Sequence, residues 1–299
     1  QQHASIGLVV TEPASAGKNI LTDYCRRAGI PVVETNRLNQ PEAVDLFRRT
    51  APDLLFSINN FKIIKEPLLA IPADGTVNFH NGPLPRYGGV NPCSWAIVNG
   101  EVEHGVTWHY VDVGIDTGEI IAQSRFPIGA RDTAGGLTVR CILEGVRLFG
   151  DIVSQIVDGT APRIPQDRTN ASYYSLKDVP NQGVIDFSWT LAELDRFVRA
   201  LSFYPLKNTL AYPKATCRSR TFYVERVVPV VSGKLAASWG TVVEIWPDRI
   251  DVQVADGVVG LTSVLDDERR TMKIVDFASS YGLAAGTLFD GAAVLQETM

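Results

Sequence analysis

The chain has 299 residues, of which 45% are hydrophobic and 20% charged, a composition typical of a globular protein with one large or two modest cores. Its formal net charge is −5 at pH 7, and no run of Lys or Arg exceeds two residues, which disfavours a nucleic-acid partner. No apolar run approaches the roughly 20 residues of a membrane span, and the N-terminus lacks a basic signal-peptide region. We therefore expect a cytoplasmic protein with no membrane partner.

The cysteines are spread widely along the chain and form no CxxC motif or Cys/His cluster in the sequence. This spacing predicts reduced thiols that fill small apolar spaces, and neither a disulfide framework nor a metal site. The four cysteines are Cys25, Cys93, Cys141 and Cys217.

The first part of the chain alternates short β-branched runs with helical spacing, which predicts βαβ units and a Rossmann-like, doubly wound, mostly parallel α/β sheet. No GxGxxG motif follows the first run and no phosphate-binding GxxxxGK[ST] motif is present, so a nicotinamide site and a P-loop are both disfavoured. The expected strands are Ser5–Thr11, Pro31–Glu34, Leu54–Ile58 and Gly75–His80, and the expected helices are Lys18–Arg27 and Pro41–Arg49.

The middle of the chain continues this α/β pattern, and the texture then changes to short β-rich pieces that predict a small antiparallel, OB-like barrel. We place the boundary so that residues 1–204 form an N-terminal catalytic domain and residues 205–299 a C-terminal barrel domain. The further expected helices are Pro92–Asn99, Gly136–Val157, Leu191–Leu201 with Thr190 as its N-cap, and Val275–Tyr281. The further expected strands are Val106–Val111, Glu119–Ser124, Phe222–Val231, Gly240–Trp246, Ile250–Val254 and Val258–Val264.

Polar side chains stand at the end of the fourth expected strand, where ligands bind in open α/β sheets. Strand alternation places Asn78 and His80 on one side of the sheet and Phe79 on the other. Such an amide and a protonated imidazole could donate hydrogen bonds to the oxyanion that forms when an amine attacks an acyl carbon. Asp116, 36 residues after His80, could hold His80 charged and order a water that relays protons.

Residues 77–128, VNFHNGPLPRYGGVNPCSWAIVNGEVEHGVTWHYVDVGIDTGEIIAQSRFPI, resemble the heart of the 10-formyltetrahydrofolate-dependent formyltransferases. The resemblance implies a formyltransferase fold followed by a barrel, and formyl transfer from 10-formyltetrahydrofolate to a primary amine, with no metal. It also implies a catalytic triad in which Asn78 and His80 polarise the formyl oxygen and Asp116 handles protonation and water.

The same resemblance implies a pterin slot between two loops. One wall would consist of Lys62, Ile63 and Ile64, and the other of the loop from Val111 to Asp116, with Val113 and Ile115, largely through backbone groups. His104 and His109 also match positions in the family pattern, and we interpret them as structural supports.

The acceptor amine is left open, because the chain departs from many relatives at Asn81-Gly82-Pro83-Leu84 and in the SINNF loop, both near the donor and acceptor channel. Glycinamide ribonucleotide is disfavoured, since the enzymes that formylate it lack the barrel. Methionyl-tRNA is disfavoured because Lys and Arg do not outnumber Asp and Glu in residues 205–299.

The overall look is most similar to formylation domains of nonribosomal peptide or polyketide assembly lines, of the linear gramicidin synthetase type. We therefore expect an aminoacyl group on a carrier-protein phosphopantetheine arm as acceptor, with a nucleotide-linked amino sugar as the alternative. The absence of a starting Met would agree with a domain cut from a longer chain. A 10-formyltetrahydrofolate hydrolase and an inactive binding module also stay open, although the intact triad argues against the latter.

Overall fold

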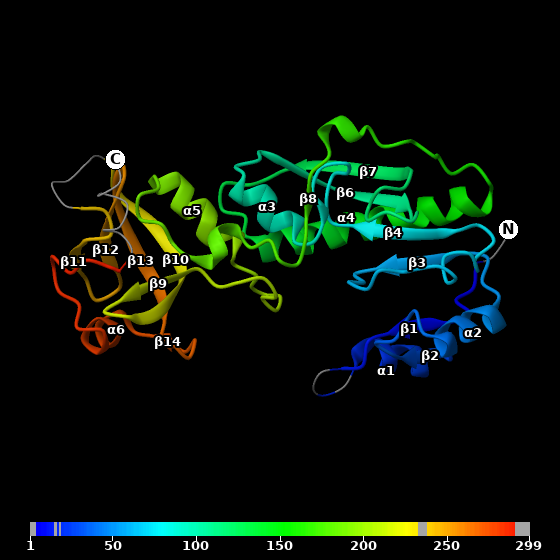
Figure 1. Ribbon diagram of the computed structural model, residues 1–299, viewed down its shortest axis with the longest axis horizontal. Helices are drawn as coiled ribbons and strands as arrows, with labels where there is room; N and C mark the ends of the chain where they lie inside the picture. Colours follow the sequence, from blue (N-terminus) through cyan, green and yellow to red (C-terminus); the bar gives the residue numbers. More distant parts are fainter. Residues whose placement is uncertain (1–3, 15–16, 18, 233–237, 291–299) are drawn as a thin grey trace. The chain divides into compact units, whose positions relative to one another are not determined.

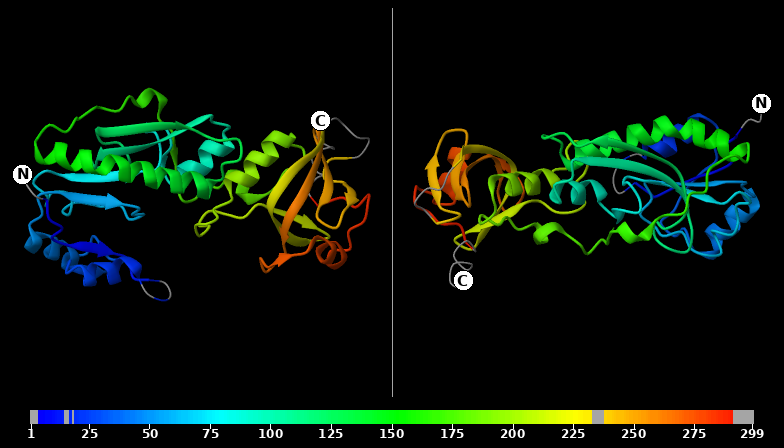
Figure 2. Two further views of the ribbon diagram at one scale, coloured as in Figure 1. Left: turned by 180° about the vertical axis from the view of Figure 1, so that it is seen from behind. Right: turned by 90° about the horizontal axis from the view of Figure 1, so that it is seen from above.

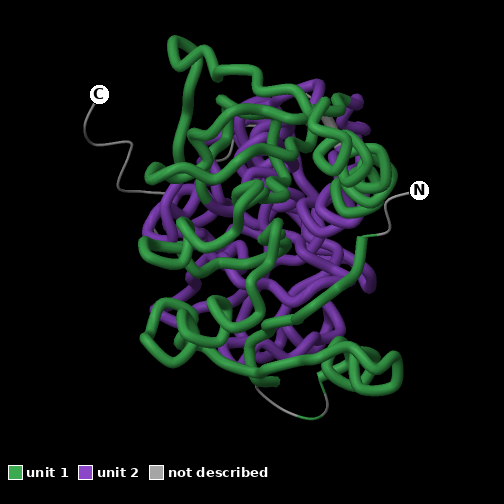
Figure 3. The backbone as a smooth tube through the Cα atoms, turned by 90° about the vertical axis from the view of Figure 1, so that its right-hand side faces the viewer, with its two compact units in different colours: residues 1–89, 105–125, 141–173 green, residues 90–104, 126–140, 174–299 purple. Residues whose placement is uncertain are grey.

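The computed structural model describes residues 4–14, 17, 19–232 and 238–290, and these divide into two compact units (Figure 3). Unit 1 comprises residues 1–89, 105–125 and 141–173, and unit 2 comprises residues 90–104, 126–140 and 174–299. Each unit thus gathers segments that are far apart in the sequence. None of the described helices combines the length and the hydropathy that crossing a membrane requires.

Unit 1 begins with a two-stranded parallel sheet formed by β1 (Val9–Thr11) and β2 (Val32–Glu34). Helix α1 (Ile20–Arg27) connects these strands, and the side chain of Asn19 caps its N-terminus. Helix α2 (Pro41–Thr50) opens with Pro at its first position, where the missing N–H is not needed. This βαβα stretch agrees with the helices and strands predicted from the sequence.

A four-stranded sheet follows, in the order β3-β4-β6-β7 (Figure 1). Strand β3 runs parallel to β4, whereas β4 and β6 are antiparallel. The α/β class is confirmed, but the sheet is mixed rather than mostly parallel, because the segment that joins β4 to β6 does not repeat the βαβ crossover. The bounds are β3 Leu55–Ile58, β4 Thr76–His80, β6 Glu103–Tyr110 and β7 Ile120–Pro127.

One face of this sheet is packed with aromatic rings beneath helix α4 (Ala134–Val157), which runs along the sheet (Figures 1 and 2). The rings of Phe79 and Trp108, opposite each other on β4 and β6, have centroids 5.0 Å apart. Trp108 Nε1 donates to the carbonyl of Gly145 on α4 at 3.1 Å. A Cβ at residue 145 would collide with the Phe79 ring, so this close approach of helix and strand requires Gly. The opposite face of β4 and β6 is left for the polar side chains.

Unit 2 holds α3 (Pro92–Val98) and α5 (Leu191–Ala200), which pack against each other. Thr190 caps α5 as predicted, and Glu193 completes a capping box with it. Further short elements lie in both units. Strand β5 (Gly88–Gly89) and the 3-10 helix Arg168–Asn170 belong to unit 1, the 3-10 helix Pro180–Gly183 belongs to unit 2, and β8 (Tyr173–Tyr174) lies at the boundary between the two.

The C-terminal part of unit 2 is the predicted antiparallel β structure, whose strand path runs β11-β12-β13-β10-β9 with β14 beside β13 (Figure 1). Its core contains Phe222, Phe277 and Phe289, all fully buried. The prediction missed β9 and β14, which are only four and two residues long. The elements are β9 Lys214–Cys217, β10 Arg220–Ser232, β11 Val242–Ile245, β12 Ile250–Val254, β13 Gly257–Leu265, β14 Thr271–Met272 and α6 Ile274–Ser280.

Candidate active site

The antiparallel register of β4 and β6 brings polar side chains together on the face opposite α4. Asn78 pairs with His109, and His80 pairs with Thr107. His80 and His109 are 6% and 1% exposed, so both imidazoles lie within the protein rather than on its surface. Strand alternation therefore places the predicted pair on one side of the sheet, and β6 adds a second histidine to it.

His109 is held by two contacts on opposite sides of its ring. Its Nδ1 lies 2.8 Å from the carbonyl oxygen of Tyr110, and its Nε2 lies 3.1 Å from Nδ2 of Asn78. A carbonyl oxygen only accepts hydrogen bonds, so Nδ1 carries a proton. The imidazole of His109 therefore links the β6 backbone to the side chain of Asn78.

His80 is held from the turn that follows β4. Its Nε2 lies 2.7 Å from the carbonyl oxygen of Tyr87 and so donates a proton to it. A Cβ at Gly82 would lie 2.7 Å from that Nε2, so a larger residue there would displace the imidazole. The bond to Tyr87 leaves Nδ1 as the ring nitrogen that faces the rest of the site.

Asp116 lies in the loop between β6 and β7, in a left-handed backbone conformation with φ of 55°. Its Oδ2 accepts a hydrogen bond from the backbone N–H of Gly89 at 2.7 Å. The same Oδ2 lies 3.6 Å from Nδ1 of His80, and Oδ1 lies 3.5 Å from Nε2 of His109. One carboxylate thus faces both imidazoles, and the structure brings the predicted His80 and Asp116 together.

The ionisation of Asp116 reflects these neighbours. Burial by itself would raise its pKa, but the positive charge of His80, the contact with His109 and the N–H of Gly89 outweigh burial. The pKa of Asp116 is lowered from 3.8 to about 2. Asp116 is therefore a carboxylate at neutral pH, able to stabilise an imidazolium beside it.

The loop that carries Asp116 is tied to the segment after α4. Gln166 Nε2 donates to the carbonyl oxygens of Asp116 and Gly118, at 2.9 and 2.7 Å. Ser172 binds the turn after β4, because its Oγ accepts from the N–H of Tyr87 at 2.8 Å and its carbonyl accepts from Gly88 at 2.9 Å. These bonds hold three separate segments around the carboxylate.

A pocket of about 370 Å³ lies beside Asp116, wholly within unit 1. The two charged side chains in its lining are Asp116 and Arg168, and Arg168 is exposed to solvent. Tyr173 and Ile115 supply apolar walls and are 53% and 41% exposed. The remaining lining residues are Pro85, Gly88, Thr117, Gln166, Ala171 and Ser172.

The first predicted wall of the pterin slot lies in the loop after β3. Lys62 Nζ forms an ion pair with Glu12 at 3.4 Å, and Ile63 is 55% exposed. Ile64 is buried in a small apolar cluster between α2 and β3. The side chain of Asn39 binds the carbonyl of Ile63, which fixes the loop at this point.

The second predicted wall lies in the loop between β6 and β7. Val111 extends the sheet pairing, because its N–H donates to the carbonyl of Thr76 at 2.8 Å. Val113 is 91% exposed, and Ile115 lines the pocket beside Asp116. Each predicted slot residue is therefore placed, and its contact with folate stays a prediction.

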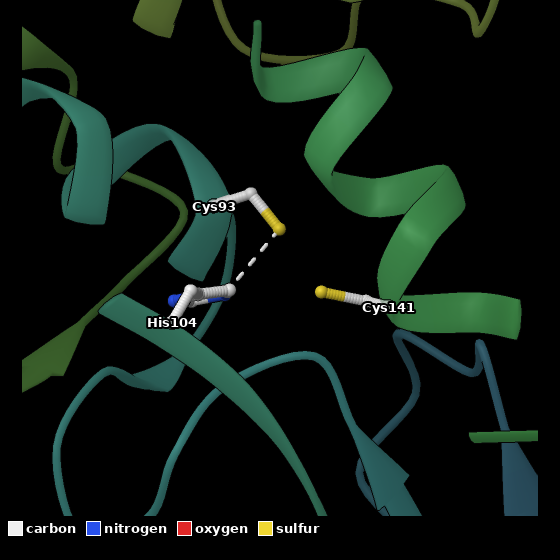
Figure 4. A group of neighbouring side chains, drawn as sticks. All are labelled: Cys93, His104 and Cys141. Carbon is white, nitrogen blue, oxygen red and sulfur yellow. Dashed lines mark hydrogen bonds between the residues drawn. The ribbon is translucent and has the colours of Figure 1, made fainter. Parts of the chain in front are cut away.

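His104, the other histidine of β6, contacts Cys93 rather than the candidate site. Cys93 Sγ lies 3.5 Å from Nε2 of His104, and both side chains are buried in unit 2 (Figure 4). Cys141, also drawn in Figure 4, is assigned to unit 1. Residues 93 and 104 meet because α3 returns toward β6, which the sequence spacing did not reveal.

Three features of the site were not predicted from the sequence: the contact of His109 with Asn78, the anchoring role of Gln166 and the position of Arg168. The pairing of Asn78 with His109 depends on the register between β4 and β6, which alternation within one strand does not specify. Gln166 and Arg168 lie in a segment read only as an extended connection.

Comparison with known proteins identifies both parts of the chain. Residues 1–151 match the family model described as formyl transferase, and residues 179–282 match the model of the formyl transferase C-terminal domain. The methionyl-tRNA formyltransferase of Azobacteroides pseudotrichonymphae is 30% identical over 286 residues, which cover 91% of this chain and 87% of that protein.

Solved structures with the same arrangement include sugar-modifying enzymes. An N-formyltransferase from Helicobacter canadensis, in complex with folinic acid and dTDP-3-aminofucose, is 25% identical, with a TM-score of 0.61 over 81% of this chain and 82% of that chain. A sugar 3N-formyl transferase, in the presence of dTDP and 5-N-formyl-THF, is also 25% identical, with a TM-score of 0.62 over 81% and 80% of the two chains.

Proposed function

Because the chain belongs to the formyl transferase family, we propose that it transfers the formyl group of 10-formyltetrahydrofolate to the primary amine of a nucleotide-linked amino sugar. The observation that carries this proposal is the pocket beside Asp116, whose lining holds one acidic and one basic side chain. An acceptor that presents an amine to Asp116 and an anionic group to Arg168 matches this charge pattern.

The reaction joins the amine nitrogen to the formyl carbon and breaks the bond between that carbon and N10 of the folate. The amine loses one proton and N10 gains one, so a group that handles protons must stand between them. Asp116, an ionised carboxylate beside the pocket, is positioned for this role, directly or through a water. The tetrahedral oxyanion needs hydrogen-bond donors, and the candidate donor is the side-chain amide of Asn78 on β4.

His80 contributes mainly through its charge in this arrangement. Its Nε2–H donates a hydrogen bond to the carbonyl oxygen of Tyr87, and its Nδ1 lies 3.6 Å from Asp116 Oδ2. A protonated His80 keeps Asp116 ionised and adds positive charge next to the developing oxyanion. For the folate itself, we retain Lys62, Ile63, Ile64, Val111, Val113 and Ile115 as the proposed pterin contacts.

The size of the pocket supports a small acceptor. About 370 Å³ lies at the lower end of the range for small-molecule sites, which suits a monosaccharide and an adjoining phosphate. The exposed face of Tyr173 offers a surface on which a sugar ring or a base can stack. Both sugar N-formyltransferase structures described above contain a dTDP group, which is of the acceptor class proposed here.

Methionyl-tRNA is the second candidate, because the relative that formylates it is 30% identical over both parts of the chain. Against it stands the absence of a Lys and Arg surplus in residues 205–299. The carrier-bound aminoacyl group expected from the sequence has no counterpart among the relatives named above. We keep it as one arm of the experiment.

The test is to follow tetrahydrofolate release from 10-formyltetrahydrofolate with each class of amine. The panel contains dTDP-linked 3- and 4-amino sugars, methionyl-tRNA, an aminoacyl carrier protein and no amine. Release with an amino sugar, and a formyl mass gain on it, would support the proposal, and Arg168→Ala should then raise the acceptor KM several-fold at unchanged folate KM. Arg49→Ala, an exposed arginine on α2, is the matched control. Release only with tRNA, with a carrier protein or without any amine would overturn it.

A further inference from the structure

Ser172, in the wall of the pocket, forms three hydrogen bonds to the turn that follows β4. Its N–H donates to the carbonyl of Pro85 at 3.2 Å, and its carbonyl accepts from the N–H of Gly88 at 2.9 Å. Its Oγ accepts from the N–H of Tyr87 at 2.8 Å. The first two bonds use the backbone of Ser172, so the bond to Tyr87 is the one that depends on the serine side chain.

Tyr87 lies in this turn in a left-handed backbone conformation, with φ of 62°. A bulky residue rarely adopts this conformation, which persists only where the surrounding contacts impose it. The peptide group before the Tyr87 Cα atom donates to Oγ of Ser172, and the peptide group after it donates, through the N–H of Gly88, to the carbonyl of Ser172. Ser172 thus holds both peptide groups that define the backbone angles of Tyr87.

The peptide group after the Tyr87 Cα atom also carries the carbonyl that holds His80. The oxygen of this group lies 2.7 Å from Nε2 of the imidazole, and the N–H of the same group binds the carbonyl of Ser172. A peptide group is planar and rigid, so its oxygen keeps its direction toward Nε2 only while the whole group stays in place. The contacts with Ser172 therefore determine how the His80 ring is held.

The next residue along the chain holds Asp116. The N–H of Gly89 donates to Oδ2 of Asp116 at 2.7 Å, and the same oxygen lies 3.6 Å from Nδ1 of His80. Residues 87–89 therefore hold the imidazole through a carbonyl and the carboxylate through an N–H. A displacement of this short segment would move both side chains at once.

We propose that Ser172 is a positioning residue for formyl transfer: its hydroxyl holds residues 87–89 so that His80 and Asp116 face each other beside the pocket. The hydroxyl acts through the backbone of this segment and not by contact with the reacting atoms. This inference rests on the roles proposed above for His80 and Asp116, and it is independent of which amine is the acceptor.

The experiment compares the wild type with Ser172→Ala, which removes the bond to Tyr87, and with Ser172→Thr, which keeps a hydroxyl. Ser175→Ala is the matched control, because Oγ of Ser175 also accepts from a backbone N–H, that of Lys177 at 3.2 Å, within its own turn. Kinetics give kcat and the KM values of 10-formyltetrahydrofolate and of the amine that releases tetrahydrofolate in the panel above. The 1H–15N spectra of labelled histidines, of which the chain has four, report the Nε2–H of His80 without any substrate.

We expect Ser172→Ala to lower kcat about 10–10²-fold, the scale on which a small misplacement of reacting groups acts, with each KM changed less than about twofold. The Nε2–H signal of His80 should shift or broaden in Ser172→Ala, because the carbonyl of Tyr87 no longer keeps its direction. Ser172→Thr should restore both properties, and Ser175→Ala should match the wild type.

Thermal unfolding and circular dichroism establish that each variant is folded at the assay temperature. A hydroxyl that serves stability alone would lower the Tm of Ser172→Ala and leave kcat and the His80 signal of the folded protein unchanged, which would overturn the proposal. A raised acceptor KM at wild-type kcat would also overturn it, because Ser172 would then contact the acceptor. Near-wild-type turnover in His80→Ala would instead refute the role proposed for His80, so the two failures are distinguishable.

Discussion

Each unit of the molecule contains a buried aspartate whose carboxylate lies next to a basic side chain and a ring nitrogen. The two aspartates differ in how closely these side chains approach the carboxylate. In unit 2, Asp251 on β12 accepts from Trp246 Nε1 and from Arg249 Nε, each at 2.8 Å. In unit 1, Asp116 accepts from the backbone N–H of Gly89 at 2.7 Å, and its two histidine side chains lie farther away, at 3.5 and 3.6 Å. The side chains of Asp251 and Asp116 are 7% and 12% exposed, so burial alone does not separate them.

The difference lies in where the partners come from and what lies next to them. The partners of Asp251 are within five residues of it and engage both oxygens at short distances, which is the pattern of a structural bond. The histidines that face Asp116 come from two neighbouring strands, and a pocket lies beside the carboxylate. A buried carboxylate with a shifted pKa beside a pocket marks a site where chemistry is expected.

The largest effect on turnover should come from a change in the cluster of Asp116, His80 and His109. We expect His80→Ala to lower kcat by about 10²–10³-fold, because it removes the positive charge that acts on both Asp116 and the oxyanion. The rate of tetrahydrofolate release under saturating substrates measures this effect. Circular dichroism should show a folded variant, and near-wild-type turnover would remove His80 from the mechanism.

The next effect concerns the stability that the charge of Asp116 provides. Its folded-state pKa of about 2 lies below the ordinary 3.8, so its contribution is fully present above pH 4 and is lost as the pH falls toward 2. A shift of this size corresponds to about 2 kcal/mol. Urea unfolding of the wild type and Asp116→Asn between pH 5 and pH 2 should show the difference between their unfolding free energies shrinking by that amount. A constant difference across the range would contradict the coupling.

A change in the cluster of Asp251, Trp246 and Arg249 should affect stability and leave turnover unchanged. We expect Asp251→Asn to lower the free energy of unfolding by about 1–2 kcal/mol, since it weakens two charge-assisted hydrogen bonds, while kcat stays unchanged. Denaturant unfolding and the turnover assay on the same preparation test both halves. A loss of turnover larger than the loss of stability explains would show that Asp251 also serves the reaction.

The smallest effect should come from Arg249→Gln. The Arg249 side chain is 29% exposed, and solvent screens the ion pair of such a side chain, so its contribution to stability is small. Its unfolding free energy should therefore stay closer to the wild type than that of Asp251→Asn. An equal loss in both variants would mean that the guanidinium, rather than the indole of Trp246, carries the interaction.

The elements of the fold were predictable where local signals were strong. Pro at the start of α2 and Thr190 before α5 mark helix ends through the backbone groups that they satisfy or lack. Short strands such as β9 and β14 lack such signals and were missed. The direction of β6 could not be predicted either, because it depends on how the connecting segment packs. The domain boundary at residues 204 and 205 remains a prediction.

The candidate site was predictable only as far as single strands allow. Alternation along β4 places Asn78 and His80 together, and the family resemblance pointed to Asp116. The partnership of Asn78 with His109 requires the pairing register of two strands, and the contact between Cys93 and His104 requires the return of α3. Such relations arise from tertiary packing and leave no spacing in the sequence.

The two hydrogen bonds from Gln166 have a consequence for how this protein can change. They fix the backbone on both sides of Thr117 from a residue that precedes Arg168, whereas Ser172, in the same pocket wall, holds the turn after β4. We expect Arg168 and Tyr173 to accept exchanges that alter the preferred amine while the transfer chemistry is preserved, and Ser172 to resist them. Gln166 would then keep the Asp116 loop in place, and with it the transfer reaction, while residues of the pocket wall change to accept a different amine.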